Sequence, residues 1–378
     1  MMREVEVLEE AKRFLKEEVA PVAEIIDRDV DALRRIVDRM GECGLLALKR
    51  PEKFGGPGMS DPLFRAFQEE VARVSGTLAF LTTQHQSAVA MIAAGSNEAL
   101  KQTYLPLMAD GTRLVGIGFS QLRRGGPPIM RATRVDGGYL LDGHVPWITG
   151  WSFYPEFMLG ATLPDSQSLF VIAPLIDIDQ EIPQYSGVFK PTSDDQSTFG
   201  RIRVSPPMQL AAMGAAMTVT AEFTNYFASD DKVAFIKPAG WIQNNDMINI
   251  ALQGHFAIGC AMAGIDVVRR NAQSKPFCFL PDAVTSFESE LAALRMATAQ
   301  AQKTAGEETT PARLEVRAWA IDFSVRCAHA AIASSSGASN SIDHPAQRIY
   351  REALVYTVSA QTPAIMEATL NRLVARRT

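Results

Sequence analysis

The sequence has few of the residues that mark secreted or metal-binding proteins. Its 378 residues include only 4 cysteines and 5 histidines. The cysteines lie far apart, with no CxxC pair and no histidine at metal-ligand spacing: Cys43, Cys260, Cys278 and Cys327. Free thiols are therefore expected rather than disulfides or a metal site. Free thiols are typical of a reducing compartment, so we predict a cytoplasmic protein.

An excess of one charge and long apolar runs are also lacking. The chain has 42 acidic and 37 basic residues, a formal net charge of −5, which argues against nucleic acid or an anionic membrane as a partner. The N-terminus has no apolar signal core. The longest mainly apolar run, residues 256–268, is shorter than the roughly 20 residues that span a bilayer. The sequence therefore predicts no membrane segment.

Apolar residues make up 47% of the chain, enough to fill the cores of two or three cooperating units. In residues 63–74 the large apolar side chains fall on one helical face, after Asp61 and Pro62 at the expected N-cap and first turn. The glycine-rich stretch 52–61 is expected to be a turn before this helix. We predict an N-terminal helical domain over residues 1–112.

The pattern changes at about residue 113, where short β-prone runs are separated by glycine, proline and aspartate. Near the end of this segment, Val219, Ala221, Phe223 and Phe227 alternate with polar residues. This period of two indicates a strand with one buried face. We therefore predict a middle β-barrel or sandwich domain over residues 113–232.

The helical period returns after Lys237 and Pro238. Four helices are expected, at residues 245–269, 284–304, 310–333 and from 345 onward. They predict a C-terminal four-helix bundle over residues 233–378, and the fold class is α+β. The small residues on its faces permit close helix packing, so a homodimer or homotetramer is expected.

Four stretches, taken in order and spacing, resemble the acyl-CoA dehydrogenase family of flavoproteins. They are GLLALKRPEKFGGPGMS, GSNEALKQTYLPLMADGTRLVGIGFS, DGGYLLDGHVPWITG and HPAQRIYREALVY. The third resembles a strand pair of that family. The resemblance implies an FAD-dependent oxidoreductase that acts on an acyl-CoA or a related small substrate. It also allows an electron-transfer or reductase partner.

The same resemblance assigns residues to the cofactor. Trp147, Ile148 and Thr149 would lie at the flavin ring, with the Thr149 hydroxyl near its N5. Ser120 stands where the family has a threonine that faces the flavin pyrimidine. Two further positions match the adenine-side glycine motif and a threonine of the last helical region: Gly337 and Thr362. A hydroxyl on a strand is more often structural, which is the alternative interpretation of Thr149.

The residues expected to perform ordinary dehydrogenation are absent. The family uses a glutamate to remove a proton, and its two usual positions hold Ala360 and Asn249 here. Asp246 is the nearest acid on that helix face and the one candidate base, although an acid near a helix N-terminus more often stabilises the helix. Three basic residues could replace the family's missing pyrophosphate arginine: Arg269, Arg270 and Lys275.

Several alternatives stay open. Loss of both base positions favours a flavin monooxygenase or oxidase on the same fold, whereas the altered glycine motif favours a non-catalytic binding relative. Arg123 and Arg124, followed by two glycines, could cradle a diphosphate or form a solvated turn. His85 and His255 could face a central cavity, although a lone histidine on a helix is more often a packing residue.

Overall fold

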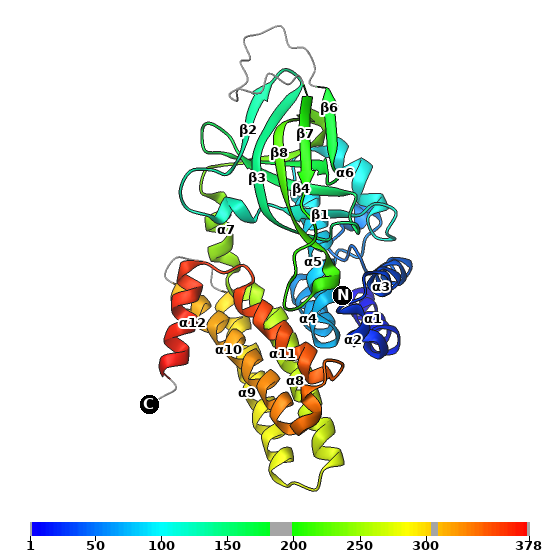
Figure 1. Ribbon diagram of the computed structural model, residues 1–378, viewed down its shortest axis with the longest axis vertical. Helices are drawn as coiled ribbons and strands as arrows, with labels where there is room; N and C mark the ends of the chain where they lie inside the picture. The colour runs from blue at the N-terminus through cyan, green and yellow to red at the C-terminus, as the bar shows by residue number, and fades with distance from the viewer. Residues whose placement is uncertain (1, 182–198, 304–308, 376–378) are drawn as a thin grey trace.

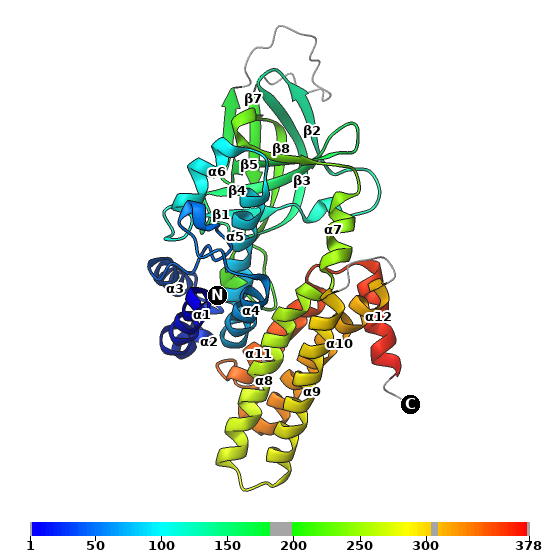
Figure 2. The ribbon, with the colours of Figure 1, turned by 180° about the vertical axis from the view of Figure 1, so that it is seen from behind.

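The computed structural model describes residues 2–181, 199–303 and 309–375 (Figure 1). N-terminal helices, a middle sheet and C-terminal helices follow one another along the chain, which confirms the predicted α+β class. The molecule is elongated, with the sheet at one end and the C-terminal helices at the other. The N-terminal helices lie beside their junction in both views (Figures 1 and 2).

The N-terminal part consists of helices joined by short turns. Its α-helices are α1 (Met2–Phe14), α2 (Ala23–Ile26), α3 (Val30–Glu42), α4 (Asp61–Val74), α5 (Gly76–Ala94) and α6 (Glu98–Tyr104). The N-cap of α4 is Ser60 rather than the expected Asp61. Ser75 separates α4 from α5, and its hydroxyl accepts a hydrogen bond from the Leu78 N–H at 3.2 Å. This cap begins a new helix immediately after α4.

The middle part is one mixed sheet with nine strands among the described residues. They are β1 (Val115–Gly118), β2 (Met130–Val135), β3 (Gly138–Thr149), β4 (Glu156–Thr162), β5 (Ser168–Pro174), β6 (Ile178–Glu181), β7 (Phe199–Val204), β8 (Thr218–Ser229) and β9 (Val233–Lys237). Their order is β6-β7-β8-β3-β2-β4-β5-β9, and β1 pairs with β4 in parallel. Because β9 pairs with β5, the sheet extends beyond residue 232 to Lys237.

A bulge changes the predicted face of β8. Alternate residues of this strand are buried as predicted as far as Phe223. Asn225, with φ +47°, then adds one residue to β8 relative to β3. The added residue reverses the alternation, so Tyr226 rather than the expected Phe227 is buried.

The C-terminal part has more helices than the four expected. They are α7 (Trp241–Asn249), α8 (Gly254–Ser274), α9 (Phe279–Lys303), α10 (Thr310–Ser335), α11 (Pro345–Val358) and α12 (Pro363–Ala375). The helix expected at residues 245–269 is divided near Asn249, whose side chain donates to the Asn245 carbonyl at 2.8 Å and competes with the helical hydrogen bond. The last helix is divided at Ala360, which has φ +49°.

Helix α8 and the turn before it form an apolar segment, residues 251–274, that is longer than the apolar run of residues 256–268 expected from the sequence. Residues 251–274 are long and apolar enough to cross a membrane, contrary to our expectation, but 72% of the tested window is buried inside the protein. A Cβ added at Gly259 would lie 2.3 Å from a main-chain oxygen of α4, and one at Gly264 would lie 2.6 Å from the main chain of α10. The burial and these close contacts identify α8 as the core helix of the bundle.

Buried charged side chains join all three parts of the chain. Asp27, which follows α2, is 1% exposed. Its Oδ1 accepts two hydrogen bonds, from the Thr77 hydroxyl at 2.9 Å and from the Met213 N–H at 3.3 Å. The other oxygen lies 2.7 Å from Arg351 of α11. The N-terminal helices, the segment before β8 and α11 therefore meet at one carboxylate.

A second buried carboxylate, Glu352, lies on α11 directly after Arg351. Glu352 is fully buried and pairs with Arg348 at 2.8 and 3.0 Å. It also accepts the Gly76 N–H at 2.9 Å, at the start of α5. Burial raises the pKa of Glu352, and the Arg348 guanidinium opposes that rise. A carboxylate in this position is stable only while these donors surround it.

We expect Gly76→Ala to destabilise the protein, because the added Cβ would lie 2.6 Å from Glu352 Cδ and 2.9 Å from the Tyr356 hydroxyl oxygen. Overpacking of this kind costs roughly 1–3 kcal/mol. Thermal or urea unfolding measures the loss. Gly125→Ala is the matched control, since no atom lies within 4 Å of its added Cβ. Equal stability of the two variants would contradict the tight contact.

Candidate functional site

The C-terminal end of β3 carries the residues expected at the flavin ring. This strand is a single bulged strand rather than the expected strand pair. Pro146 has no N–H for the ladder, and the register against β8 shifts between Val145 and Ile148. Within the bulge, Trp147 is 40% exposed, whereas the Ile148 side chain after it lies in the core. The bulge therefore presents one large aromatic ring at the surface.

Thr149 ends β3 with a buried hydroxyl. Its side chain is 2% exposed, and Oγ1 lies 3.0 Å from Oγ1 of Thr218, the residue opposite it on β8. One hydroxyl proton is used between the two oxygens, so the pair retains one proton that can be donated elsewhere. Two neighbouring strands hold this donor in place. The sequence predicted a role for Thr149 but gave no sign of Thr218, because strand register brings the two residues together.

Ser120 lies beside this strand end and has an unused hydroxyl. It begins a short 3-10 turn, Ser120–Arg123, that follows β1 and packs against β3. A Cβ added at Gly118 of β1 would lie 3.3 Å from Ile148, so the two segments are in close contact. The Ser120 Oγ is buried and has no hydrogen-bond partner among the described residues. A buried polar atom without a partner is uncommon and points to a missing ligand or water.

The structure does not bring Gly337 to this place. Gly337 belongs to the 3-10 turn after α10, and nothing lies within 4 Å of a Cβ added to it. Ser336 before it has φ +56°, a conformation that favours glycine. The turn lies near the C-terminal end of α8, where Asn271 donates to Ser335 at 3.0 Å. The sheet, by contrast, joins the N-terminal end of α8 through α7 (Figure 1).

Thr362 lies in the turn between α11 and α12, and its hydroxyl accepts the Ile365 N–H at 3.3 Å. Ala360 in the same turn is exposed. Sequence reasoning missed Arg317 of α10, which is 1% exposed and donates to the carbonyls of Tyr356 and Ser359 at 3.4 and 3.0 Å. Burial lowers the pKa of Arg317 to about 10. This guanidinium caps the C-terminal end of α11 and holds the turn.

The candidate base Asp246 is engaged in an ion pair. Its two carboxylate oxygens accept hydrogen bonds from Arg123 Nε and Nη2 at 2.6 and 2.9 Å. Gln243 of the same helix donates to the Leu122 carbonyl at 3.1 Å. Helix α7 is thereby tied to the turn that carries Ser120. The sequence left open a diphosphate cradle or a solvated turn at Arg123 and Arg124, and neither alternative included this ion pair of Arg123 with Asp246.

Other candidate side chains are also bound within the chain. Arg269 pairs with Glu288 at 2.6 Å, and Lys275 donates to the Ser334 carbonyl. His255 Nδ1 lies 2.7 Å from Glu69, and its Nε2 is buried without a partner among the described residues. No group of three potential metal ligands occurs within the ranges that the structure describes.

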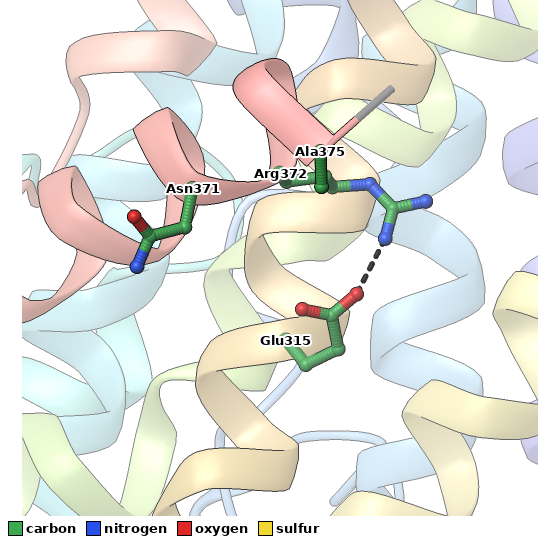
Figure 3. A pocket seen from close by; sticks show the side chains of 4 residues that line it. All are labelled: Glu315, Asn371, Arg372 and Ala375. Atoms are coloured by element: carbon green, nitrogen blue, oxygen red, sulfur yellow. Dashed lines mark hydrogen bonds and ion pairs between the residues drawn. The ribbon is translucent and has the colours of Figure 1, made fainter. Parts of the chain in front are cut away.

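A surface pocket of about 330 Å³ lies between α10 and α12, away from these candidates (Figure 3). Glu315, Asn371, Arg372 and Ala375 line it, and Glu315 pairs with Arg372 across it. None of the residues expected to hold a cofactor lines this pocket. Its two charged side chains are already paired with each other.

Known proteins share both the N-terminal sequence and the fold. The family model described as acyl-CoA dehydrogenase, N-terminal domain, matches residues 3–112. Mitochondrial isovaleryl-CoA dehydrogenase of Pongo abelii is 29% identical over 143 residues, covering 36% of this chain and 34% of that protein. Butyryl-CoA dehydrogenase from Megasphaera elsdenii has a TM-score of 0.77 over 99% of this chain and 98% of its own, at 17% identity. The sequence match to the acyl-CoA dehydrogenase family therefore covers the N-terminal helices, and the whole chain shares its fold with the solved butyryl-CoA dehydrogenase.

The likeness in fold extends over much more of the chain than the likeness in sequence. The matched segments span 34 to 44% of the length of three curated relatives. A solved structure of KijD3 in complex with FMN and a dTDP-linked amino sugar has a TM-score of 0.74 over 99% of this chain and 94% of that chain, at 15% identity. At such low identity, the structural likeness establishes the fold alone.

We expect Asp246→Asn to reduce stability by about 1–3 kcal/mol, because it leaves the partly buried Arg123 without its counter-charge. Chemical unfolding of both proteins measures the difference. Asp142→Asn is the control: its carboxylate lies 3.9 Å from the exposed Arg131, and such a pair contributes little. A stability unchanged in Asp246→Asn would show that the ion pair does not tie α7 to the sheet.

The buried His85 of α5 is expected to make the stability of the protein depend on pH. Its Nε2–H donates to the Met108 carbonyl at 2.8 Å, and its Nδ1 accepts the Val115 N–H at 3.0 Å. Burial lowers the pKa of His85 below its usual 6.5. As pH falls below 6.5, the unfolded chain binds this proton before the folded chain does, so stability falls by up to about 1.4 kcal/mol per pH unit.

The comparison of wild type with His85→Gln isolates this contribution from that of the carboxylates. The variant should be less stable near neutral pH and should lose less stability between about pH 6.5 and 5. Denaturant unfolding at several pH values gives both slopes. Parallel slopes for the two proteins would contradict the assignment of a buried neutral His85.

Proposed function

We propose that this protein is an FAD-dependent oxidoreductase acting on an acyl-CoA or a related small substrate. The observation that carries the proposal is the buried, unpartnered Ser120 hydroxyl beside the Thr149–Thr218 pair. An unsatisfied buried hydroxyl costs roughly 1–3 kcal/mol. A flavin ring has acceptor atoms along one edge that two fixed hydroxyl donors fit, and a bound flavin would accept hydride from a substrate.

The proposed cofactor contacts support a homo-oligomer. Thr149 lies in the sheet, which adjoins the N-terminal end of α8, whereas Gly337 lies near Asn271 at the other end. A helix of 21 residues is roughly 30 Å long, so one FAD would reach both only if a second copy supplied one of them. Helix α11 also exposes an apolar stripe of Tyr350, Leu354 and Val358. We propose that this surface contributes to a homodimer or homotetramer.

Ordinary dehydrogenation needs a base that this chain does not place at either family position. Ala360 has no acidic group, and the Asn249 side chain is bound to Asn245. Asp246 is held by Arg123. These three positions favour a second candidate, a flavin monooxygenase or oxidase, in which oxygen chemistry does not require the glutamate. A monooxygenase would take its reducing equivalents from a reductase, whereas an oxidase would take them from its own substrate and pass them to oxygen. The reducing equivalents of a dehydrogenase would leave to an electron-transfer protein.

We also propose a cytoplasmic location. The support is chemical: all four cysteines are free thiols, with Cys43 and Cys278 exposed. Exposed thiols persist most readily in a reducing compartment.

The function is tested by mixing FAD-loaded protein with acetyl- to palmitoyl-CoA without oxygen and recording the flavin absorbance. Bleaching by an acyl-CoA is the expected result for a dehydrogenase. Oxygen consumption that requires a reductase, with no bleaching by any acyl-CoA, would establish the monooxygenase instead. A protein that retains FAD but supports neither reaction would be a binding relative, and the proposal of an oxidoreductase would be wrong.

We expect Ser120→Ala to separate cofactor binding from folding. The Ser120 hydroxyl has no partner within the described part of the chain, so the free protein should be as stable as wild type or slightly more stable. Loss of one hydrogen bond to the flavin should weaken FAD binding by about tenfold. Fluorescence titration of FAD measures the affinity, and Ser205→Ala provides a control at a serine that bonds only within the chain. Unchanged FAD affinity in Ser120→Ala would contradict the assigned contact.

A further inference from the structure

The last residues of β3 have a neighbouring strand on one side only. The register with β2 ends at Gly143, which lies opposite Met130. The register with β8 continues to Thr149, which lies opposite Thr218. Residues 145–149 therefore have β8 along one edge, and no strand in the described part of the chain pairs with their other edge. An unpaired strand edge presents main-chain N–H and C=O groups to whatever lies beside it, so a ligand can approach here.

Thr218, in contrast, has protein main chain on both sides. Strand β3 lies on one side, and the Thr218 main-chain carbonyl accepts the Met208 N–H at 2.8 Å on the other. The Thr218 side chain is 2% exposed. Among the described residues, its hydroxyl has one hydrogen-bond partner, Thr149 Oγ1 at 3.0 Å. The proton of Thr218 therefore has an acceptor only at Thr149.

The hydrogen bond between the two hydroxyls can run in either direction. If Thr149 donated, the proton of Thr218 would be buried without an acceptor in the described part of the chain, which costs stability. If Thr218 donates, the proton left over is that of Thr149, beside the open edge of β3. A ligand at this edge can accept that proton. The second direction is therefore the one in which a bound ligand leaves both protons hydrogen-bonded.

We propose that Thr218 is a positioning residue for the flavin: it donates its proton to Thr149 and thereby directs the Thr149 proton toward the ligand at the open edge of β3. The inference rests on the proposed flavin function and deepens it. A hydroxyl that accepts a hydrogen bond is fixed in orientation and is polarised into a stronger donor. Thr149 then presents a fixed donor beside the unpartnered Ser120 hydroxyl, whose turn packs against β3.

Two flavins that differ at one ring position test the direction of the proton. In 5-deaza-FAD a C–H group replaces N5, the acceptor atom expected near Thr149, so this analogue cannot accept a hydrogen bond there. Wild type should bind FAD about tenfold more tightly than 5-deaza-FAD, the contribution of one hydrogen bond. Thr149→Val should abolish this preference. Calorimetric titration of the cofactor-free protein with each flavin gives both Kd values.

Thr218→Val should reduce the preference for FAD from about tenfold to about threefold or less, because the Thr149 hydroxyl is no longer held in its donating orientation. Thr218→Ser keeps the hydroxyl and should retain the tenfold preference. Thr224→Val makes the same change further along β8 and should leave the preference as in wild type. A merely structural role for Thr218 would weaken the binding of the two flavins equally.

Equal binding of FAD and 5-deaza-FAD by wild type would overturn the inference, and this comparison needs no variant. A larger preference for FAD in Thr218→Val than in wild type would show that Thr149 donates to Thr218, the opposite direction. An unchanged preference in a folded Thr218→Val protein would also overturn it. A protein that binds both flavins without preference overturns this inference alone. A protein that binds neither flavin overturns the flavin function, and this inference with it.

Discussion

The structure depends on two buried carboxylates, Asp27 and Glu352, that must be paired. Isolated charges of this kind are too costly to bury. Asp27 pairs with Arg351 of α11, Glu352 pairs with Arg348 of its own helix, and each carboxylate also accepts a hydrogen bond from the start of α5. Because the partners come from α5 and α11, the two helical parts are locked together. The Met213 N–H brings in the segment before β8. The contact of Met213 with Asp27 fixes the start of β8 against the helices, and β3 is paired with β8.

The cofactor-side geometry is a consequence of that placement. The end of β3 lies against α5, and Tyr154 after it donates to the Leu81 carbonyl at 2.7 Å. Pro146 forces the bulge that exposes Trp147, and the strand then ends at the Thr149–Thr218 hydroxyl pair. Ser120 arrives from β1, which also packs on α5. A donor set from three segments is therefore held by rigid elements, which is what an oriented cofactor needs.

The sequence predicted the architecture well where local patterns determine structure. The one-sided apolar period before Val74 predicted α4, and the alternation up to Phe223 predicted β8. The prediction was wrong where a single backbone conformation decided the outcome: the bulge at Asn225, the break at Asn249 and the turn at Ala360. Positive φ at residues other than glycine is stabilised by tertiary contacts, which one sequence does not reveal.

The site was only partly predictable for the same reason. Ser120 and Thr149 were predicted from their surrounding motifs, but the contacts around the predicted residues depend on long-range packing. Thr218 is 69 residues from Thr149, and Arg123 is 123 residues from Asp246. Arg317 was missed because an arginine within a helix usually indicates a solvated face, whereas this one is buried beneath the α11–α12 turn. The absence of a glutamate at Ala360 and Asn249 was visible in the sequence. Its effect on the reaction depends on the substrate.

The central claim is that the end of β3 and the Ser120 turn form a flavin site. The most direct measurement is the absorption spectrum and FAD content of the purified protein after incubation with excess FAD and removal of free cofactor. The account predicts a yellow protein that retains FAD in stoichiometric amount and has the absorption bands of a bound flavin. A correctly folded but colourless protein that takes up no FAD would contradict it.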